Sequence, residues 1–471
     1  MTETLLAMSI GVPLIAAFTT PFIGRVSRSA QYTCAIGFML VTLISSIVLM
    51  SETINLGKIS AVGLLYADAA STFVITVISL LGLAAVIYST RYMEKDGNQN
   101  LYYFLSFLFI ANMIGLSLTY NIVLLYVFLE TATVSSAILV LYGRTIKALN
   151  ATFVYLVLSI FGAVLVLIGI FLYYSLFHAV DLRVISASVT NPTNPNLVLS
   201  TAVLIFLGFG IKAGMVPFGL IWLPKAHAEA PSPISCLLSG VLVQVSAFAM
   251  AKIIYFPIFG AFEALKWTVA TFGVLSMIIG SAFAFLERDI KRMLAYSTIS
   301  EIGFIVLMIG VGTALSISAY LGHILNHALA KGLLFLCAGT IIYQTGLRDM
   351  NNLGGLAKRM PITTVAFLIG AFTLIGIPPL LGFYTGRMLE EASSELASFL
   401  PTFGTITTII TFLFYAKAIY KIFIRRIPEQ LKEAKEAPVV LQIPVLILAV
   451  LIVIFGLFPN IVMGAVRLIA G

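Results

Sequence analysis

The stretch that decides the fold is residues 206–224, FLGFGIKAGMVPFGLIWLP. It is a long apolar run with one lysine, Lys212, well inside it and a proline, Pro217, shortly afterwards. A lysine at the centre of a membrane helix costs about 2.5–3.5 kcal/mol on insertion scales, so it needs internal water or a partner. Proline lacks the N–H that would continue the helix. The stretch therefore predicts a membrane helix that is broken just after a buried lysine, as at ion sites of transporters.

The composition of the whole chain also indicates a membrane protein. Of its 471 residues, 60% are hydrophobic and only 10% are charged, whereas a soluble domain carries about 25% charged residues. This excludes a single water-soluble globule and intrinsic disorder. The apolar runs are continuous rather than alternating, which argues against an outer-membrane β-barrel. The sequence therefore predicts an all-α polytopic membrane protein.

Apolar length and breaker residues predict about fourteen transmembrane helices. The predicted spans are 4–24, 31–50, 69–90, 101–119, 121–142, 150–177, 197–223, 232–256, 266–286, 296–312, 318–343, 361–391, 398–424 and 440–468. Pro217 breaks the seventh of them, and Pro378 and Pro379 break the twelfth. Because an odd offset inverts topology, the second broken helix predicts two inverted five-helix repeats.

These spans divide the chain into four parts. They are an N-terminal three-helix segment at 1–100, a first repeat at 101–256, a second repeat at 266–424, and a loop with a C-terminal helix at 425–471. No soluble domain is inserted between them.

The basic residues predict the orientation. With the N-terminus outside, the loops that face the cytoplasm hold most of the lysines and arginines, and the opposite side holds only Lys58, Arg183, Lys266 and Arg467. This asymmetry follows the positive-inside rule and supports this orientation. The expected location is the cell membrane of a prokaryote, as a multi-pass protein. The net charge of +8 is not arranged as a basic stripe with interleaved aromatics, so no nucleic acid partner is expected.

Several charged residues fall within the spans rather than in the loops. Lys252 and Lys417 lie near span ends, where their long stems are expected to reach the headgroups. Glu130 lies in the middle of the apolar run 122–139. A lone membrane carboxylate is as costly as a lone lysine, so Glu130 and Lys212 are predicted to approach each other. The pair then holds a proton when it is closed and releases it when it opens, and the alternative is a static structural salt bridge.

His323, His327 and Lys331 recur at every fourth position in residues 320–339, YLGHILNHALAKGLLFLCAG. This spacing puts them on one helix face, as a column about 12 Å long. Histidine accepts and donates protons near neutral pH, so the column predicts a proton relay. The alternatives are histidines that pack by hydrogen bonds, or ligands of a haem or a metal.

His227 follows the first broken span in the proline-rich connection LPKAHAEAPSP, residues 223–233. Here it is predicted either to pass protons toward Lys212 or beyond, or to cap the loop. Cys34, Cys236 and Cys337 lie in apolar runs without a CxxC pair, so neither a metal site nor a disulfide is expected. No nucleotide, flavin or iron–sulfur motif occurs, so the chain is expected to hold no cofactor and no catalytic centre of its own.

Three stretches resemble one known family. They are GFGIKAGMVPFGLIWLPKAHAEAPSPISCLLSGVLV at 208–243, LERDIKRMLAYSTISEIG at 286–303 and HILNHALAKGLLFLCAG at 323–339. They are similar to the antiporter-like subunits of complex I, of Mrp-type cation/proton antiporters and of membrane-bound hydrogenase-type complexes. The resemblance covers nearly the whole chain and implies fourteen core helices with two inverted repeats. It implies roles for the fifth-helix glutamate Glu130, the seventh-helix lysine Lys212, the eleventh-helix group of His323, His327 and Lys331, and the histidine after the first broken helix, His227.

The chain departs from the family pattern at two places. Some members carry a lysine in the eighth helix where this chain has Gln244. Most members carry a lysine or glutamate in the second broken helix, where this chain has Gly386, followed by Arg387 and Glu390. Either Arg387 or Glu390 replaces the missing group as an exit, or the second half-channel is impaired.

The resemblance implies a membrane subunit that moves protons, with sodium exchange as an open alternative, inside a larger hetero-oligomer. Its expected partners are other membrane subunits and, in a redox-driven complex, peripheral iron–sulfur or hydrogenase-like subunits. Two other classes stay open. One is a non-conducting structural subunit, and the other is a quinone- or haem-binding electron carrier with His323 and His327 as candidate ligands.

Overall fold

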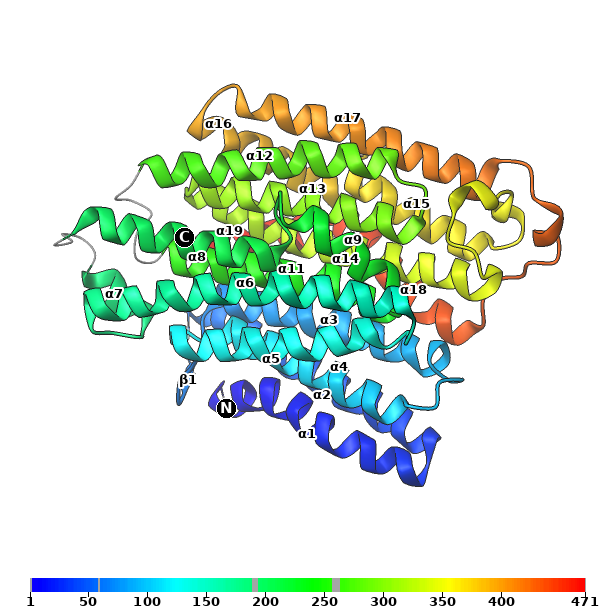
Figure 1. Cartoon of the computed structure of the whole chain (residues 1–471), viewed down its shortest axis with the longest axis horizontal. Coiled ribbons are helices and arrows are strands. Elements are labelled where there is room, and N and C mark those ends of the chain that lie inside the picture. Colours follow the sequence, from blue (N-terminus) through cyan, green and yellow to red (C-terminus); the bar gives the residue numbers. More distant parts are fainter. Residues whose placement is uncertain (1, 58–59, 189–193, 256–262, 471) are drawn as a thin grey trace.

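The computed structural model describes residues 2–57, 60–188, 194–255 and 263–470, and most of them are helical (Figure 1). Long helices run side by side in one direction, which is horizontal in Figure 1. Their backbone polar groups are paired within each helix, which is what an apolar bilayer requires of a spanning segment. Within the described residues, 13 helices are long and apolar enough to cross a membrane.

The helices and strands have the following bounds. The first part contains α1 (Thr2–Val26), α2 (Arg28–Leu56), β1 (Ser60–Val62), β2 (Leu65–Ala67), α3 (Ala69–Tyr92), α4 (Gln99–Leu118), α5 (Ile122–Leu141), α6 (Ile146–Phe177), α7 (Leu182–Ser188), α8 (Pro195–Ala213), α9 (Gly219–Glu229), α10 (Ser232–Leu237), the π-helix η1 (Leu238–Leu242) and α11 (Val243–Tyr255). The second part contains α12 (Glu263–Leu286), α13 (Ile290–Val311), α14 (Ala314–Thr345), η2 (Met350–Asn352), η3 (Leu356–Lys358), α15 (Pro361–Ile375), α16 (Leu381–Leu396), α17 (Leu400–Ile419), the π-helix η4 (Tyr420–Ile424), η5 (Glu429–Leu431), α18 (Val439–Leu457) and α19 (Asn460–Ala470).

The all-α membrane architecture predicted from the sequence is confirmed. The predicted span at 361–391 is present as two helices, α15 and α16, which are 15 and 16 residues long. Each is shorter than the roughly 20 residues that span a bilayer. The total of fourteen spans, the inverted repeats and the four-part division therefore stay predictions.

The last predicted span, 440–468, is wrong as a single helix. Helix α18 ends at Leu457, and α19 begins at Asn460 as a separate short helix. Pro459 lies between them and has no N–H with which to continue the first helix. Two predicted loops also hold structure, because β1 pairs with β2 as an antiparallel hairpin and α7 lies in the polar stretch 179–196.

The two ends of the bundle differ in what they carry. Both chain termini, β1 and α7 lie toward one end, at the left of Figure 1. The loop between α17 and α18, which contains Arg425, Arg426, Lys432 and Lys435, lies at the opposite end. We call these the terminus end and the basic end. The positive-inside rule predicts that the basic end faces the cytoplasm.

Helices α12 and α13 pack backbone against backbone. A Cβ atom added to Gly303 would come within 2.5 Å of Met277 N, and one added to Gly280 would come within 2.6 Å of Ser300 N. Small residues allow such close approach, which replaces the hydrophobic effect as the source of helix association in lipid. This contact holds α13, which carries Lys291, Ser297 and Glu301 of the site described below.

We expect Gly303→Leu to destabilise the chain by about 1–3 kcal/mol, because the added side chain has no space and must push the helices apart. The measurement is the melting temperature and the yield of monodisperse protein in mild detergent. Gly37→Leu is the matched control, since nothing lies within 4 Å of a Cβ atom at this helical glycine. Equal losses in the two variants would contradict the proposed importance of the α12–α13 contact.

Candidate functional site

The first broken helix places Lys212 at the end of α8. Helix α8 ends at Ala213, and Gly214 follows with φ 77°, a conformation that L side chains rarely adopt. The freed backbone groups are paired: Trp222 Nε1 donates to Ile211 O at 3.0 Å, and Val216 N donates to Ser276 Oγ at 3.1 Å. The break is therefore a fixed element of the fold, and it leaves the lysine beside non-helical backbone.

Lys212 and Glu130 form an ion pair between α8 and α5. Lys212 Nζ lies 3.0 Å from Glu130 Oε1 and donates to Thr133 Oγ1 at 2.7 Å. The lysine side chain is 1% exposed and the glutamate side chain 25% exposed. Glu130 Oε1 accepts no hydrogen bond from the described residues, so the lysine charge is what holds this oxygen. The two groups that the sequence predicts to approach each other are in contact.

His323, His327 and Lys331 are all buried on one face of α14. The two imidazole rings are parallel to within 9°, with centroids 6.2 Å apart. Lys331 Nζ donates to Ser297 Oγ in a close contact. It also lies 3.4 Å from Tyr415 OH. The column thus connects α14 to hydroxyl groups on α13 and α17.

Gln244 holds one histidine of this column. With its amide oriented to satisfy both ends, Gln244 accepts hydrogen bonds from His327 Nδ1 at 2.5 Å and Ala328 N at 3.1 Å, and it donates to Ile324 O at 2.8 Å. This assigns the proton of neutral His327 to Nδ1 and leaves Nε2 as an acceptor. Nε2 is buried and has no partner among the described residues. The residue that departs from the family pattern therefore sets the tautomer of His327.

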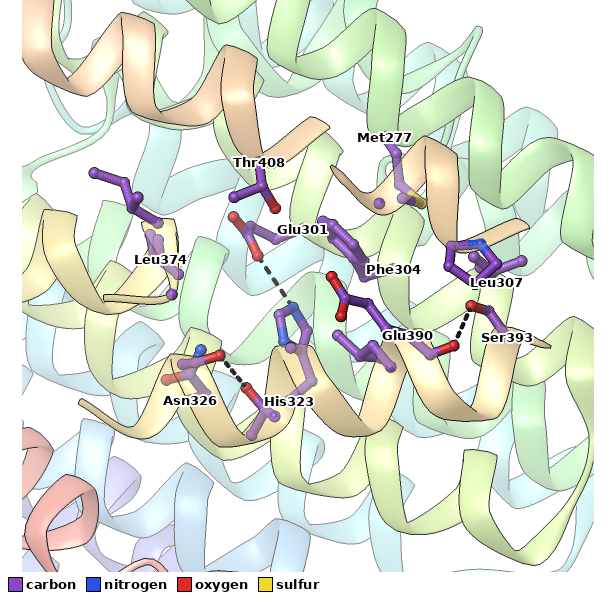
Figure 2. Close-up of a pocket in the computed structure, with 18 of the residues that line it drawn as sticks. Met277, Glu301, Phe304, Leu307, His323, Asn326, Leu374, Glu390, Ser393 and Thr408 are labelled. Carbon is purple, nitrogen blue, oxygen red and sulfur yellow. Dashed lines mark hydrogen bonds and ion pairs between the residues drawn. The ribbon is translucent and has the colours of Figure 1, made fainter. Parts of the chain in front are cut away.

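Glu301 is a site residue that the sequence-based predictions did not include. Its Oε2 lies 3.1 Å from His323 Nε2, and the two side chains are only 4% and 5% exposed (Figure 2). Glu301 lies in the middle of the apolar helix α13, as Glu130 does in α5. The rule that identified Glu130, a carboxylate at membrane depth, applies equally to Glu301. The second half of the chain therefore holds a second pair of a carboxylate with a base.

Glu301 and His323 line a cavity with about 60 Å³ of room for water, which is enough for several molecules. The cavity lies against the second break, where α15 ends at Ile375 and α16 begins at Leu381. Asn326 and Glu390 line the same cavity, and Figure 2 shows the labelled side chains around it.

The two residues predicted to replace the missing exit group lie differently in α16. Both are exposed, but Glu390 lines the cavity and Arg387 is not among its lining residues. Gly386 also lines the cavity, and a Cβ atom there would meet nothing within 4 Å. The space that a side chain would occupy at position 386 is therefore open, and Glu390 is the acidic group of α16 that borders it.

His227 is completely buried near the column. Its ring stacks on Phe335 with a centroid distance of 4.7 Å, and neither ring nitrogen has a hydrogen-bond partner among the described residues. Lys291 and Lys331 are close enough to act on it electrostatically. His227 therefore lies with the lysine of the α14 column.

The prediction that Lys252 reaches the headgroups is wrong. Lys252 is 4% exposed and donates to Ser71 Oγ at 2.7 Å and to Ser117 O at 2.5 Å. The reason is that α11 is packed inside the bundle, mainly against α8, α13 and α4, so the side chain meets protein instead of lipid. Lys417 does lie at a helix end, where it donates to Glu287 O at 3.0 Å.

Comparison with known proteins identifies the family. A family model described as "NADH:quinone oxidoreductase/Mrp antiporter, TM" matches residues 119–411. A second model, "NADH-Ubiquinone oxidoreductase (complex I), chain 5 N-terminus", matches residues 54–103. The first match includes both pairs of a carboxylate with a base and the whole α14 column.

Two relatives with curated descriptions illustrate the range of the family. The chain is 28% identical to NADH-quinone oxidoreductase subunit N of Desulforudis audaxviator, over 97% of this chain and 96% of that protein. It is 32% identical to a Na(+)/H(+) antiporter subunit of Alkalihalophilus pseudofirmus, over 84% of this chain. The chain matches only 52% of the length of that antiporter subunit, which is thus about twice as long as the shared region.

Two solved structures share the fold. A chain of the Mrp complex from a Dietzia species superposes with a TM-score of 0.90 at 22% identity, covering 99% of this chain and 97% of that one. A chain of the membrane-bound sulfane sulfur reductase, an archaeal respiratory membrane complex, gives 0.91 at 25% identity, covering 99% and 96%. The resemblance deduced from the sequence motifs is confirmed, and the chain belongs to the family of NADH:quinone oxidoreductase and Mrp antiporter membrane subunits.

Proposed function

We propose that this chain translocates protons across the membrane as one subunit of a larger complex. The observation that carries the proposal is the buried Lys212 ammonium, 3.0 Å from the Glu130 carboxylate and beside the first helix break. While the carboxylate is near, it stabilises the charged lysine. When the carboxylate withdraws, desolvation favours the neutral amine and the proton leaves. Glu130 is suited to this role because it is the more exposed partner.

The second half would receive the proton through the α14 column. His327 Nε2 is available as an acceptor because Gln244 engages Nδ1. Lys331 and His227 supply further proton-binding groups, and Ser297 and Tyr415 supply hydroxyls for transfer. Glu301 would stabilise protonated His323 as Glu130 stabilises protonated Lys212. Glu390 is the preferred exit group over Arg387, because it borders the cavity at His323.

The relatives indicate the setting in which this chain works. One relative is named as part of a Na(+)/H(+) antiporter, and another is named as part of an NADH-quinone oxidoreductase. We infer that the chain lies beside other membrane subunits in a prokaryotic cell membrane, with its N-terminus outside. Sodium is the candidate exchange ion if the complex is an antiporter. Peripheral iron–sulfur or hydrogenase-like subunits are the expected partners if it is redox-driven.

One observation favours a second candidate function, a structural subunit that does not conduct. Gly386 leaves the cavity of the second half without a titratable side chain at the position where most family members carry one. If Glu390 does not substitute for that group, the proton path ends inside the membrane. The chain would then support a complex whose transport runs through other subunits.

The test uses inside-out vesicles from cells that contain the whole complex, with or without this chain. A pH-sensitive dye reports internal acidification when the complex is energised, and collapse of the pH gradient when sodium is added. Proton flux that disappears with the chain and returns with its plasmid-borne copy is the expected result. Flux that persists without the chain, in a complex that still assembles, would establish the structural alternative.

A further inference from the structure

Lys252 is a buried lysine that the proposed proton path does not use. Its ammonium group is held by Ser71 Oγ, by Ser117 O and by the face of the Tyr120 ring, whose centroid lies 4.4 Å away. No carboxylate of the described residues lies within ion-pair distance of Nζ. A lysine that is buried in protein without an adjacent counter-ion is costly, and a buried ionisable group beside a cavity is a candidate functional residue.

Lys252 lines a cavity of about 650 Å³ at the terminus end of the bundle. This volume is far larger than a single water molecule needs. Its titratable lining groups are Lys252, Asp68, Tyr120 and Tyr320, and the remaining lining is mostly apolar. The cavity lies where α3 begins and α4 and α11 end, so it is at the opposite end of the bundle from the basic end.

Asp68 is the charged group that acts on Lys252 electrostatically. Its Oδ1 accepts from Ser71 N at 2.7 Å, and Oδ2 accepts a close hydrogen bond from Tyr120 OH. Because Ser71 Oγ accepts from Lys252, one serine connects the carboxylate to the lysine. The Asp68 carboxylate is thus near the lysine, but its oxygens accept hydrogen bonds from Ser71 N and Tyr120 OH instead.

Helix α11 connects Lys252 to the α14 column. Gln244, Phe248 and Lys252 follow one another at every fourth position of α11, so they share one face and span about 12 Å. Gln244 at the inner end binds His327. Phe248 lies between, with its ring centroid 5.1 Å from Lys252 Nζ. One helix face therefore leads from a relay histidine to a second buried lysine, interrupted by a single aromatic ring.

We propose that Lys252 is a second proton-exchange residue, through which protons pass between the His327 region and the cavity at the terminus end. In the release direction, Lys252 gives a proton from Nζ to water in the cavity beside Asp68. The neutral amine then accepts a proton that crosses the Phe248 position on internal water. The inference rests on the proposed function and adds an outlet for the first half that does not depend on Glu390.

Lys252→Arg tests the proposal, because arginine keeps the positive charge but cannot give up its proton in a protein. We expect assembly to be normal and proton flux in energised vesicles to fall at least about tenfold, within the range that a positioned acid–base group contributes. Lys417→Arg, at a helix end outside the site, is the matched control and should keep full flux. Full flux in Lys252→Arg would overturn the proposal and leave this lysine a structural role.

A labelling experiment tests the cavity independently of transport. Lys252→Cys, in a background with Cys34, Cys236 and Cys337 replaced by alanine, should react with a small charged thiol reagent added on the side of the terminus end. Ser246→Cys, a buried position on the same helix, should react at least about tenfold more slowly. Labelling of both cysteines at the same slow rate would contradict a water-filled cavity.

One further variant, Lys212→Met, distinguishes failure of the Lys252 proposal from failure of the proposed function. If Lys212→Met abolishes flux while Lys252→Arg does not, the outlet is elsewhere but the proposed function stands. If neither change affects flux in an assembled complex, the proposed function itself fails.

Discussion

Replacing Lys212 by methionine is expected to reduce proton flux by about a hundredfold or more, to the background of vesicles without the chain. Methionine has a similar length and is compatible with the apolar environment, but its thioether does not bind a proton. A positioned acid–base group typically contributes a factor of about 10²–10⁴, and no other buried amine of the described residues lies beside the first break. The measurement is dye-reported acidification of energised vesicles, normalised to the amount of assembled complex.

The control for this variant is Lys147→Met, an exposed lysine at the start of α6. It should leave flux unchanged. Glu130→Gln should have a smaller effect than Lys212→Met, because it removes the group that tunes the lysine but keeps the proton carrier. Normal flux in an assembled Lys212→Met complex would refute the role of Lys212 as proton carrier.

Replacing Lys331 by methionine is the second change for which we expect a large effect, a loss of flux of at least about tenfold. Lys331 lies where α14 meets Ser297 and Tyr415, so its removal interrupts the column between the two halves. The acidification assay of energised vesicles gives the measurement. Tyr415→Phe is the graded comparison, since it deletes only the hydroxyl 3.4 Å from Nζ.

The relative losses of proton flux in Lys331→Met and Tyr415→Phe test the role of the α14 column. Tyr415→Phe should keep more than about half of the flux, because Ser297 still accepts from Lys331. Equal losses in Lys331→Met and Tyr415→Phe would indicate that the hydroxyl, and not the amine, is essential. Unchanged flux in both would place the proton path outside α14.

The first half of the site could be predicted because its residues are single charged groups in otherwise apolar stretches. Lys212 and Glu130 each stand alone in an apolar run, and the cost of burying either charge predicts their contact. Pro217 marks the break for an equally local reason, since it cannot continue a helix. The structure brings Lys212 and Glu130 to 3.0 Å, as the energetic argument requires.

The remainder of the site depends on helix packing, which a single sequence does not disclose. Glu301 follows the same burial rule as Glu130, but only the crossing of α13 and α14 assigns it to His323. The exposure of Lys252 was predicted wrongly because it depends on how α11 packs against α8, α13 and α4, which come from other parts of the chain. In the sequence, Gln244 stands where some family members have a lysine, which suggests that a functional group is missing. In the structure, Gln244 binds His327 across the helix interface.

The most direct test of a proton-exchanging lysine is the flux of the Lys212→Arg complex. Arginine keeps the positive charge and a partner for Glu130, so assembly should be preserved, but its guanidinium does not deprotonate in proteins. We predict that vesicles with this variant assemble the complex in normal amounts and show no acidification above that of vesicles lacking the chain. Acidification at the native rate would mean that only a fixed positive charge is needed at position 212, and it would contradict the mechanism.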